Sequence, residues 1–164
     1  MTTAQSLKSQ KGFTLIELLV VIGILAILLA IVLIAINPAR QFAQANNTKR
    51  SSDVQALLNA IQQYAADNAG ALPAGLSANM ATTDISSTAL DAINAGDGAA
   101  FCSSLVTRYI AALPQDPGSN GGANLTDCSA AYDTRYTVAV SASDNRITID
   151  APDAELSASI SATR

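Results

Sequence analysis

The sequence predicts an α+β fold in which a long N-terminal α-helix carries a small antiparallel β-sheet, and three observations support this class. An apolar run without a single charge extends over Leu18–Ile36. Residues 54–65 then place apolar side chains at helical spacing. Residues 135–140 and 145–149 alternate apolar and polar side chains, as half-buried strands do. With 164 residues, the chain is long enough for one domain and an extended element.

The N-terminal part of the chain predicts one membrane-spanning helix. The nineteen residues from Leu18 to Ile36 would span about 28 Å as a helix, close to the hydrocarbon thickness of a bilayer. Lys8 and Lys11 precede the run and no further basic residue follows until Arg40, which favours a cytoplasmic N-terminus. A secretory signal peptide has a shorter apolar region and a small-residue cleavage site, which residues 34–38 do not resemble. An unprocessed signal anchor is the stronger alternative, and it accounts for everything except Glu17.

Glu17 is the informative residue of this segment, because a lone carboxylate beside a membrane span costs on the order of a few kcal/mol and needs a partner. If the chain were cut after Gly12, the new α-amino group of Phe13 would lie four residues from Glu17. In a packed array that amine could pair with Glu17 of a neighbouring subunit, which would couple charge neutralisation to assembly.

Residues 11–20, KGFTLIELLV, resemble the class III signal of type IV prepilins and pseudopilins. The resemblance implies that a prepilin peptidase cuts between Gly12 and Phe13 and then N-methylates Phe13. It also implies that Glu17 is the fifth residue of the mature chain and serves in assembly through charge pairing.

Pro38 interrupts the apolar run and predicts a kink or a break in the helix. In pilins a proline in this stretch lets the helix unwind locally inside the filament, and a simple interfacial kink at the membrane exit is the alternative. Helical pattern then resumes in one apolar stripe: Val54, Leu57, Leu58, Ile61, Tyr64 and Ala65. A coiled-coil dimer is the other interpretation of this stripe, but the repeat is short.

The head is predicted to contain a hairpin of residues 135–140 and 145–149, closed by residues 141–144. Residues 71–98 are predicted to be an irregular surface connection that has room for a third strand. A short helix is expected around 99–112, ended by the turn at 113–118. The predicted organisation is therefore a leader at 1–12, a transmembrane and filament-core helix at 13–36, a helix continuation packing on the head at 37–69, and an acidic head with a C-terminal β-hairpin at 70–164.

Composition excludes several classes of function. The chain has no histidine, which removes Ser-His-Asp and Cys-His catalysis and every histidine-ligated metal site. Residues 70–164 hold four basic and ten acidic residues, so the head is a poor candidate for binding nucleic acid. The two cysteines, Cys102 and Cys128, predict one disulfide in a segment outside the cytoplasm, with two buried thiols as the alternative.

No cofactor and no metal are expected. The turn at Leu113–Pro117 resembles a Leu-Pro-x-Asp-Pro turn of the major pseudopilins of type II secretion, which also carry a calcium site in a later loop. The acids considered as calcium ligands, Asp116, Asp127, Asp133 and Asp144, form no EF-hand pattern. Solvated loop carboxylates are therefore the preferred interpretation, and calcium is the alternative.

The resemblance implies a structural subunit, the major pilin of a type IV pilus, and not an enzyme. Its implied partners are copies of itself in a helical filament, the prepilin peptidase, the pilus assembly platform and, before assembly, the membrane. The protein is then a single-pass membrane protein with its head outside the cytoplasm, and later part of an extracellular pilus. The alternative is a pseudopilin of a type II secretion or competence (DNA-uptake) system. A membrane-anchored enzyme is disfavoured by the absence of catalytic motifs, and an adhesive head remains an added role.

Overall fold

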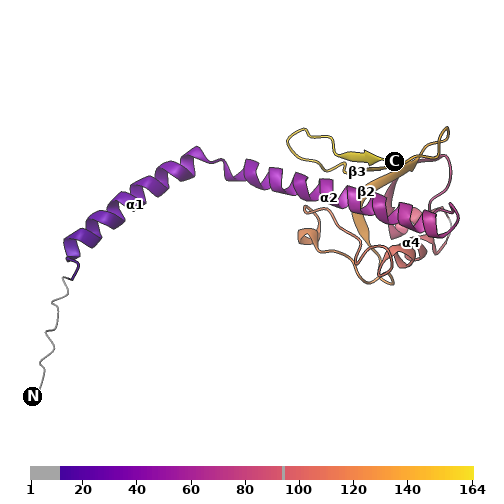
Figure 1. The fold of residues 1–164 in the computed structure, drawn as a ribbon, viewed down its shortest axis with the longest axis horizontal. Coiled ribbons are helices and arrows are strands. Elements are labelled where there is room, and N and C mark those ends of the chain that lie inside the picture. Colours follow the sequence, from indigo (N-terminus) through magenta and orange to yellow (C-terminus); the bar gives the residue numbers. More distant parts are fainter. Residues whose placement is uncertain (1–11, 94) are drawn as a thin grey trace, which may run out of the picture. The chain divides into compact units, whose positions relative to one another are not determined.

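The computed structural model describes residues 12–93 and 95–164. They belong to two compact units, one that ends at Ala39 and one that begins at Arg40. The architecture is the predicted α+β class, with a long helical N-terminal part and a four-stranded antiparallel sheet (Figure 1). Of the predicted leader, residues 1–11 lie outside the described residues. The elements in chain order are α1 Leu15–Ala35, α2 Pro38–Asp67, β1 Met80–Ser86, α3 Ser87–Asp91, α4 Asp97–Leu105, a 3-10 turn at Asn120–Gly122, β2 Asp133–Val140, β3 Ile147–Asp150 and β4 Ser161–Thr163.

The helical N-terminal part is interrupted between α1 and α2. Ile36 caps α1 with an extended backbone, at φ −94° and ψ 121°. Pro38 has no amide hydrogen, and its ring disfavours helical geometry at Asn37, so the ladder of α1 cannot continue. Pro38 instead becomes the first residue of α2, a position where the missing hydrogen costs nothing. The helix α1 thus ends at Ala35 and α2 begins at Pro38. This is the interruption that was expected near Pro38.

The apolar stripe of α2 forms one side of the head's core. Val54, Leu57, Leu58 and Ile61 are all buried, as the helical spacing predicted. The helix ends at Asp67, and Gly70 follows in the left-handed region with φ 88°. Its amide bonds back to the carbonyl of Ala65 at 2.7 Å, and Ala69 before it is already left-handed with φ 54°, so the chain leaves the helix through two consecutive left-handed residues.

The sheet has the order β1-β2-β3-β4, and every neighbouring pair is antiparallel. The predicted hairpin is confirmed as β2 and β3, with Val138 opposite Ile149. β1 is the third strand for which residues 71–98 had room. The strand β4 was not predicted, because Ser-Ala-Thr has no large apolar residue to alternate. It is held by pairing with β3, where Ala162 lies opposite Ile149.

Two expectations for the head were wrong in extent. The connection at 71–98 is not irregular throughout, since it contains β1 and α3. The helix expected at 99–112 begins at Asp97 and ends already at Leu105. Val106 leaves the helix with an extended backbone and Thr107 has a φ of 70°. Both are β-branched residues, which lose side-chain freedom in a helix, and the following apolar residues pack from a turn instead.

The core of the head lies where α2, α4 and the sheet meet. Leu57 and Ile61 from α2, Phe101 from α4, and Tyr136 and Val138 from β2 are all 0% exposed and belong to one cluster. Figure 1 shows the strands gathered beside the C-terminal part of α2. Burial of several large apolar side chains, each worth about 1.5–3 kcal/mol, is the main stabilisation of this unit.

A buried ion pair fixes the turn at 113–118 to α2. Arg50 is 2% exposed and Asp116 is 1% exposed. Nε and Nη2 of Arg50 donate to the two carboxylate oxygens of Asp116 at 2.6 and 3.0 Å. The amide of Asp116 in turn donates to the carbonyl of Thr134 at 3.1 Å, at the start of β2. The bidentate geometry is the strong form of an arginine–carboxylate contact, and it joins helix, turn and sheet.

The surroundings of this pair set the ionisation of Asp116. Burial alone would raise the pKa of its carboxyl group. Hydrogen bonds from Arg50 and from the amide of Gly118, together with the charge of Arg50, outweigh burial and leave the pKa below its ordinary value. The same bond to Asp116 raises the pKa of Arg50 against the effect of its burial. Both groups therefore stay charged at neutral pH.

We expect Asp116→Asn to destabilise the head by about 3 kcal/mol at neutral pH, because it removes the bidentate partner of a buried guanidinium and leaves only the half-buried carboxylate of Glu155, at 3.4 Å, as a counter-charge. Chemical unfolding of the full-length chain in detergent, followed by circular dichroism, measures the change. The matched control is Asp84→Asn, which removes the same charge from an exposed position and should shift stability by less than about 0.5 kcal/mol. Equal effects of the two substitutions would show that the buried pair has no special role.

The pH dependence follows from the direction of the shift. A carboxyl group whose pKa is lower in the folded state stabilises the fold above its unfolded pKa, about 3.9 for aspartate. This contribution is lost as the pH falls from that value through the lower folded pKa. The unmodified chain should therefore lose stability more steeply below about pH 4 than Asp116→Asn does. Parallel slopes for the two proteins in acid would contradict the assignment.

Candidate assembly site

The N-terminus of α1 carries a reciprocal capping box formed by Thr14 and Glu17. The hydroxyl oxygen of Thr14 accepts a hydrogen bond from the amide of Glu17 at 3.3 Å. Oε2 of Glu17 accepts from the amide and from the hydroxyl of Thr14, at 2.8 and 2.7 Å. Two amides that have no partner inside the helix are thereby satisfied, and the acid lies in the first turn, where the helix dipole favours a negative charge. The capping box fixes where α1 begins and where its carboxylate points.

Glu17 is placed among apolar side chains. Phe13, Ile16, Val20 and Val21 line a shallow depression together with Glu17. Phe13 itself is 83% exposed. Oε1 of Glu17 accepts no hydrogen bond from any residue in the described part of the chain. One carboxylate oxygen is thus engaged by Thr14 and the other is accessible at the edge of an apolar face.

The rest of α1 is an apolar surface that its own unit leaves uncovered. The helix has 21 residues, a mean hydropathy of 3.5 and no buried residue. Its length of about 31 Å matches a bilayer core, so by length and composition it fits a single-pass membrane anchor. The same surface would be buried equally well by packing against other apolar helices.

The structure places the residues that the sequence singled out in three separate regions. Gly12 and Phe13 precede α1 and Glu17 lies in its first turn. Pro38 opens α2. Cys102 of α4 and Cys128 are joined by a disulfide with a Cα–Cα distance of 5.4 Å. Cleavage after Gly12, methylation of Phe13 and charge pairing by Glu17 remain predictions.

The disulfide between Cys102 and Cys128 stabilises the loops of the head. It encloses the turn at 113–118 and joins the buried end of α4 to the loop before β2. The loop-entropy model gives a bridge of this span about 3–4 kcal/mol of stabilisation. Cys102 is 0% exposed, so the bridge is anchored in the core and holds the outer loop to it.

The four acids that were weighed as calcium ligands do not gather. Asp116 is bound by Arg50, whereas Asp127 accepts from the amide and the hydroxyl of Ser129. Asp133 accepts from the amide of Arg135, and Asp144 from the amide of Arg146. Among residues 12–93 and 95–164, no three acidic or cysteine side chains are arranged to hold a metal ion.

Two important residues were missed at the sequence level. Thr14 could have been found, because Thr14-Leu15-Ile16-Glu17 fits the S/T-x-x-E pattern of a capping box. Arg50 was not singled out from the sequence. Its partner Asp116 is 66 residues away, and no local pattern indicates such a pair.

Comparison with known proteins agrees with the geometry of the N-terminus. The family model described as the prokaryotic N-terminal methylation motif matches residues 7–33. No curated protein and no solved structure matches the chain significantly. The matched region covers the capping box, Glu17 and most of α1. The chain therefore carries, at residues 7–33, the class III signal of type IV pilins and pseudopilins followed by a hydrophobic helix.

Proposed function

We propose that this protein is a structural subunit, the major pilin, of a type IV pilus. The observation that carries the proposal is the methylation motif on a fully exposed apolar helix whose first turn holds one carboxylate. The apolar surface of such a helix can be buried either in a bilayer or in a bundle of like helices. The first state suits a stored precursor and the second suits a filament core. The role is structural and requires no catalysis by the chain itself.

The proposed pathway begins with the chain as a single-pass membrane protein whose head lies outside the cytoplasm. A prepilin peptidase cleaves between Gly12 and Phe13 and methylates the new amino group of Phe13. The assembly platform then moves the subunit from the membrane into a helical filament of identical copies. In the filament, Glu17 of one subunit pairs with the Phe13 amine of a neighbour, and the pilus extends from the cell surface.

The capping box leaves one carboxylate oxygen of Glu17 available for the proposed pairing. In the structure Thr14 donates hydrogen bonds only to Oε2 of Glu17. Oε1 can therefore accept a charged donor while the helix keeps its capping box. A methylated amine keeps its positive charge. A carboxylate that stays unpaired in an apolar surrounding costs on the order of a few kcal/mol, and pairing with a neighbour's amine removes that cost, so packed subunits with this pair are favoured over packed subunits without it.

A pseudopilin of a type II secretion or DNA-uptake system is the second candidate. The turn at Leu113–Pro117, which resembles that of the major pseudopilins, supports it. Here this turn is buried and bound to α2 through Asp116, so it is a structural element of the head. Long sheared surface fibres would favour the pilin, and a secretion defect without fibres would favour the pseudopilin.

N-terminal mass spectrometry of protein recovered from sheared surface material tests the processing. We expect a chain that begins at Phe13 and is about 14 Da heavier than the unmodified peptide, from one N-methyl group. A chain that still begins at Met1 and is confined to membranes would exclude processing and leave a signal-anchored protein.

We expect Glu17→Ala to be cleaved normally but to yield few or no filaments, because the carboxylate that receives the neighbour's amine is gone. Immunoblots of the processed chain and electron microscopy of sheared fractions measure the two steps separately.

Thr14→Ala is the matched control for this substitution. It removes the helix cap, worth about 1 kcal/mol, and leaves the carboxylate in place. If Glu17 acts through its charge, Thr14→Ala should assemble much better than Glu17→Ala. Equal assembly defects would reduce the role of Glu17 to helix capping, and normal filaments of Glu17→Ala would remove its role altogether.

A further inference from the structure

Two segments of the chain fit the Asn-x-Ser/Thr pattern of an N-glycosylation acceptor, and they lie in different surroundings. The first, Asn46-Asn47-Thr48, lies inside α2. The side-chain amide of Asn46 donates to the carboxylate of Glu155 at 3.2 Å. The hydroxyl of Thr48 donates to the carbonyl of Gln44 at 2.9 Å. Because side chains two residues apart in a helix do not face each other, this segment does not present its asparagine and threonine together.

The second segment, Asn124-Leu125-Thr126, has the opposite properties. Leu125 exchanges two backbone hydrogen bonds of 2.8 Å with Leu113, as an isolated antiparallel bridge, and packs against the core. In an extended segment the residues on either side of an inward-facing one point outwards, and Asn124 and Thr126 are both exposed. Neither side chain forms a hydrogen bond with residues 12–93 or 95–164. The folded head thus presents the amide and the hydroxyl of the pattern on one exposed face.

Asn124 also lines a polar groove of about 540 Å³. The groove carries hydroxyl and amide side chains and one carboxylate, and none of its lining residues is basic. Its polar lining consists of Ser87, Thr88, Gln115, Ser119, Asn124 and Asp133. Without a cation the groove has no charge that would attract a phosphate or another anion. Hydroxyl and amide groups both donate and accept hydrogen bonds, which suits a neutral ligand rich in hydroxyl groups.

Gln115 gives this groove an acceptor that the fold leaves open. The residue is 6% exposed, and its Nε2 donates to the carbonyl of Asp133 at 3.2 Å. Its Oε1 accepts no hydrogen bond from the described part of the chain. No side-chain oxygen or nitrogen in that part is both sealed from solvent and unpaired, so Oε1 is reached from outside. A hydroxyl group in the groove would supply the missing donor.

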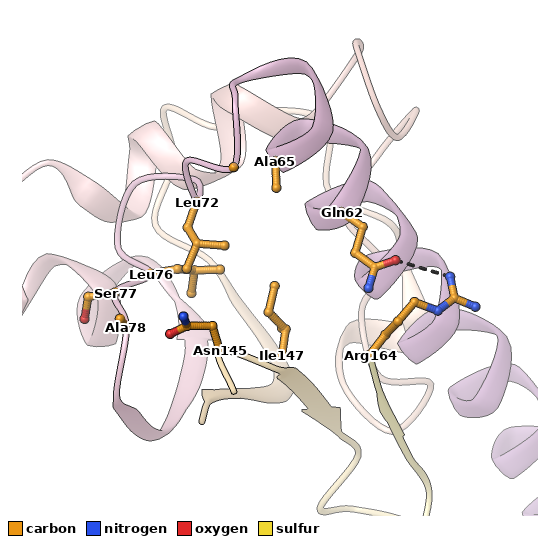
Figure 2. A pocket seen from close by; sticks show the side chains of 10 residues that line it. Gln62, Ala65, Leu72, Leu76, Ser77, Ala78, Asn145, Ile147 and Arg164 are labelled. Carbon is orange, nitrogen blue, oxygen red and sulfur yellow. Dashed lines mark hydrogen bonds between the residues drawn. The ribbon is translucent and has the colours of Figure 1, made fainter. Parts of the chain in front are cut away.

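A hollow of similar volume on the head, about 500 Å³, is of a different kind. Figure 2 shows Leu72, Leu76 and Ile147 pointing into it. Leu76 and Ile147 belong to the core and are 8% and 5% exposed, so they offer little surface to a ligand. Neither of the two acceptor patterns borders this hollow. It therefore serves as an internal reference for the groove beside Asn124.

We propose that Asn124 carries an N-linked glycan and that the first sugar of this glycan lies in the polar groove. The co-substrate is a sugar activated as a glycosyl diphosphate on a lipid carrier, and a glycosyltransferase of the cell brings the two together. Nδ2 of Asn124 attacks the anomeric carbon of that sugar. A carbon–nitrogen bond forms and the bond from this carbon to the phosphate oxygen breaks. The lipid diphosphate leaves with the electron pair, and Nδ2 gives one proton to a base of the transferase.

The inference goes beyond the proposed function and uses only one part of it, the location of the head outside the cytoplasm. The bridge at Leu125 and the disulfide at Cys128 hold the acceptor segment in its exposed shape. The folded head is therefore an acceptor both before and after assembly. Filament packing is not needed for the modification.

Mass spectrometry of the reduced tryptic peptide 109–135, which contains Asn124, tests the modification in protein from the native cell. We expect the wild-type peptide to be heavier by one or more sugar residues. Asn124→Gln and Thr126→Ala should each remove the added mass, whereas Thr126→Ser keeps a hydroxyl and should retain it. Asn46→Gln is the matched control: it should leave peptide 109–135 modified, and wild-type peptide 41–49 should carry no sugar.

The outcomes separate this inference from the proposed function, because the same digest shows whether the chain begins at Phe13. An unmodified peptide 109–135 from a processed chain would overturn the glycan and leave the pilin assignment standing. Added mass that persists in Asn124→Gln would place the sugar on another residue and would also overturn it. A glycosylated chain that is never processed at Phe13 would contradict the pilin assignment alone.

Hydrogen exchange tests whether the sugar lies in the groove. The glycosylated wild-type chain and Asn124→Gln are compared, both full-length in detergent. Amides of residues 119–125 and 131–133, which border the groove, should exchange several-fold more slowly in the glycosylated chain, because the sugar covers them. Amides of residues 72–78, which border the hollow in Figure 2, should exchange equally in both. Equal rates at the groove would show that the sugar extends into solvent.

Discussion

The head depends on the buried pair between Arg50 and Asp116, because this contact joins three parts of the chain that share no sequence pattern. Arg50 belongs to α2, Asp116 to the turn before β2, and the amide of Asp116 bonds to the first residues of β2. A buried pair loses the hydration of both charges, and such pairs often add little net stability. Here Nε and Nη2 bond to Asp116, and Nη1 bonds to Asn47. Because its bonds are directional, the pair fixes where the turn sits on the helix, whereas apolar packing alone would allow it to slide.

The two units differ in whether their apolar side chains are buried. The head buries most of its large apolar side chains, and Leu57, Ile61 and Phe101 are fully buried. The helix α1 exposes all of its apolar side chains and has no buried residue. Such a helix is stable only in lipid or against other apolar helices. The proposed transfer from membrane to filament therefore exchanges one apolar environment for another. The gain that distinguishes the two states must come from packing and from the charge of Glu17, because apolar burial is nearly equal in both.

The parts of the fold that the sequence predicted are those encoded in neighbouring residues. The run of α1 is evident from its length and lack of charge, whereas the stripe of α2 and the alternation of β2 and β3 repeat with the period of their element; all were found. The strand β4 has three small residues and exists through its pairing with β3. The roles of Arg50 and Asp116 depend on a contact 66 residues along the chain, whereas the early end of the helix at Leu105 coincides with two β-branched residues whose effect was not weighed. The assembly site is different, because Gly12, Phe13, Thr14 and Glu17 lie within six residues and form a legible motif.

Asn47 connects the buried ion pair to the turn at residues 155–158, which precedes β4. Its side-chain oxygen accepts from Nη1 of Arg50 at 3.0 Å and from the amide of Glu155 at 2.9 Å. Nη1 of Arg50 also lies 3.4 Å from the carboxylate of Glu155. The guanidinium that holds Asp116 therefore also orients Asn47, the residue that bonds directly to Glu155. A head that kept its core but lost Asp116 would keep the bonds of Asn46 and Asn47 to Glu155, whereas the turn at 113–118 would lose its ion pair with α2. Because the bonds to α2 differ for the two turns, the ion pair holds the turn before β2 directly and only supports the turn before β4.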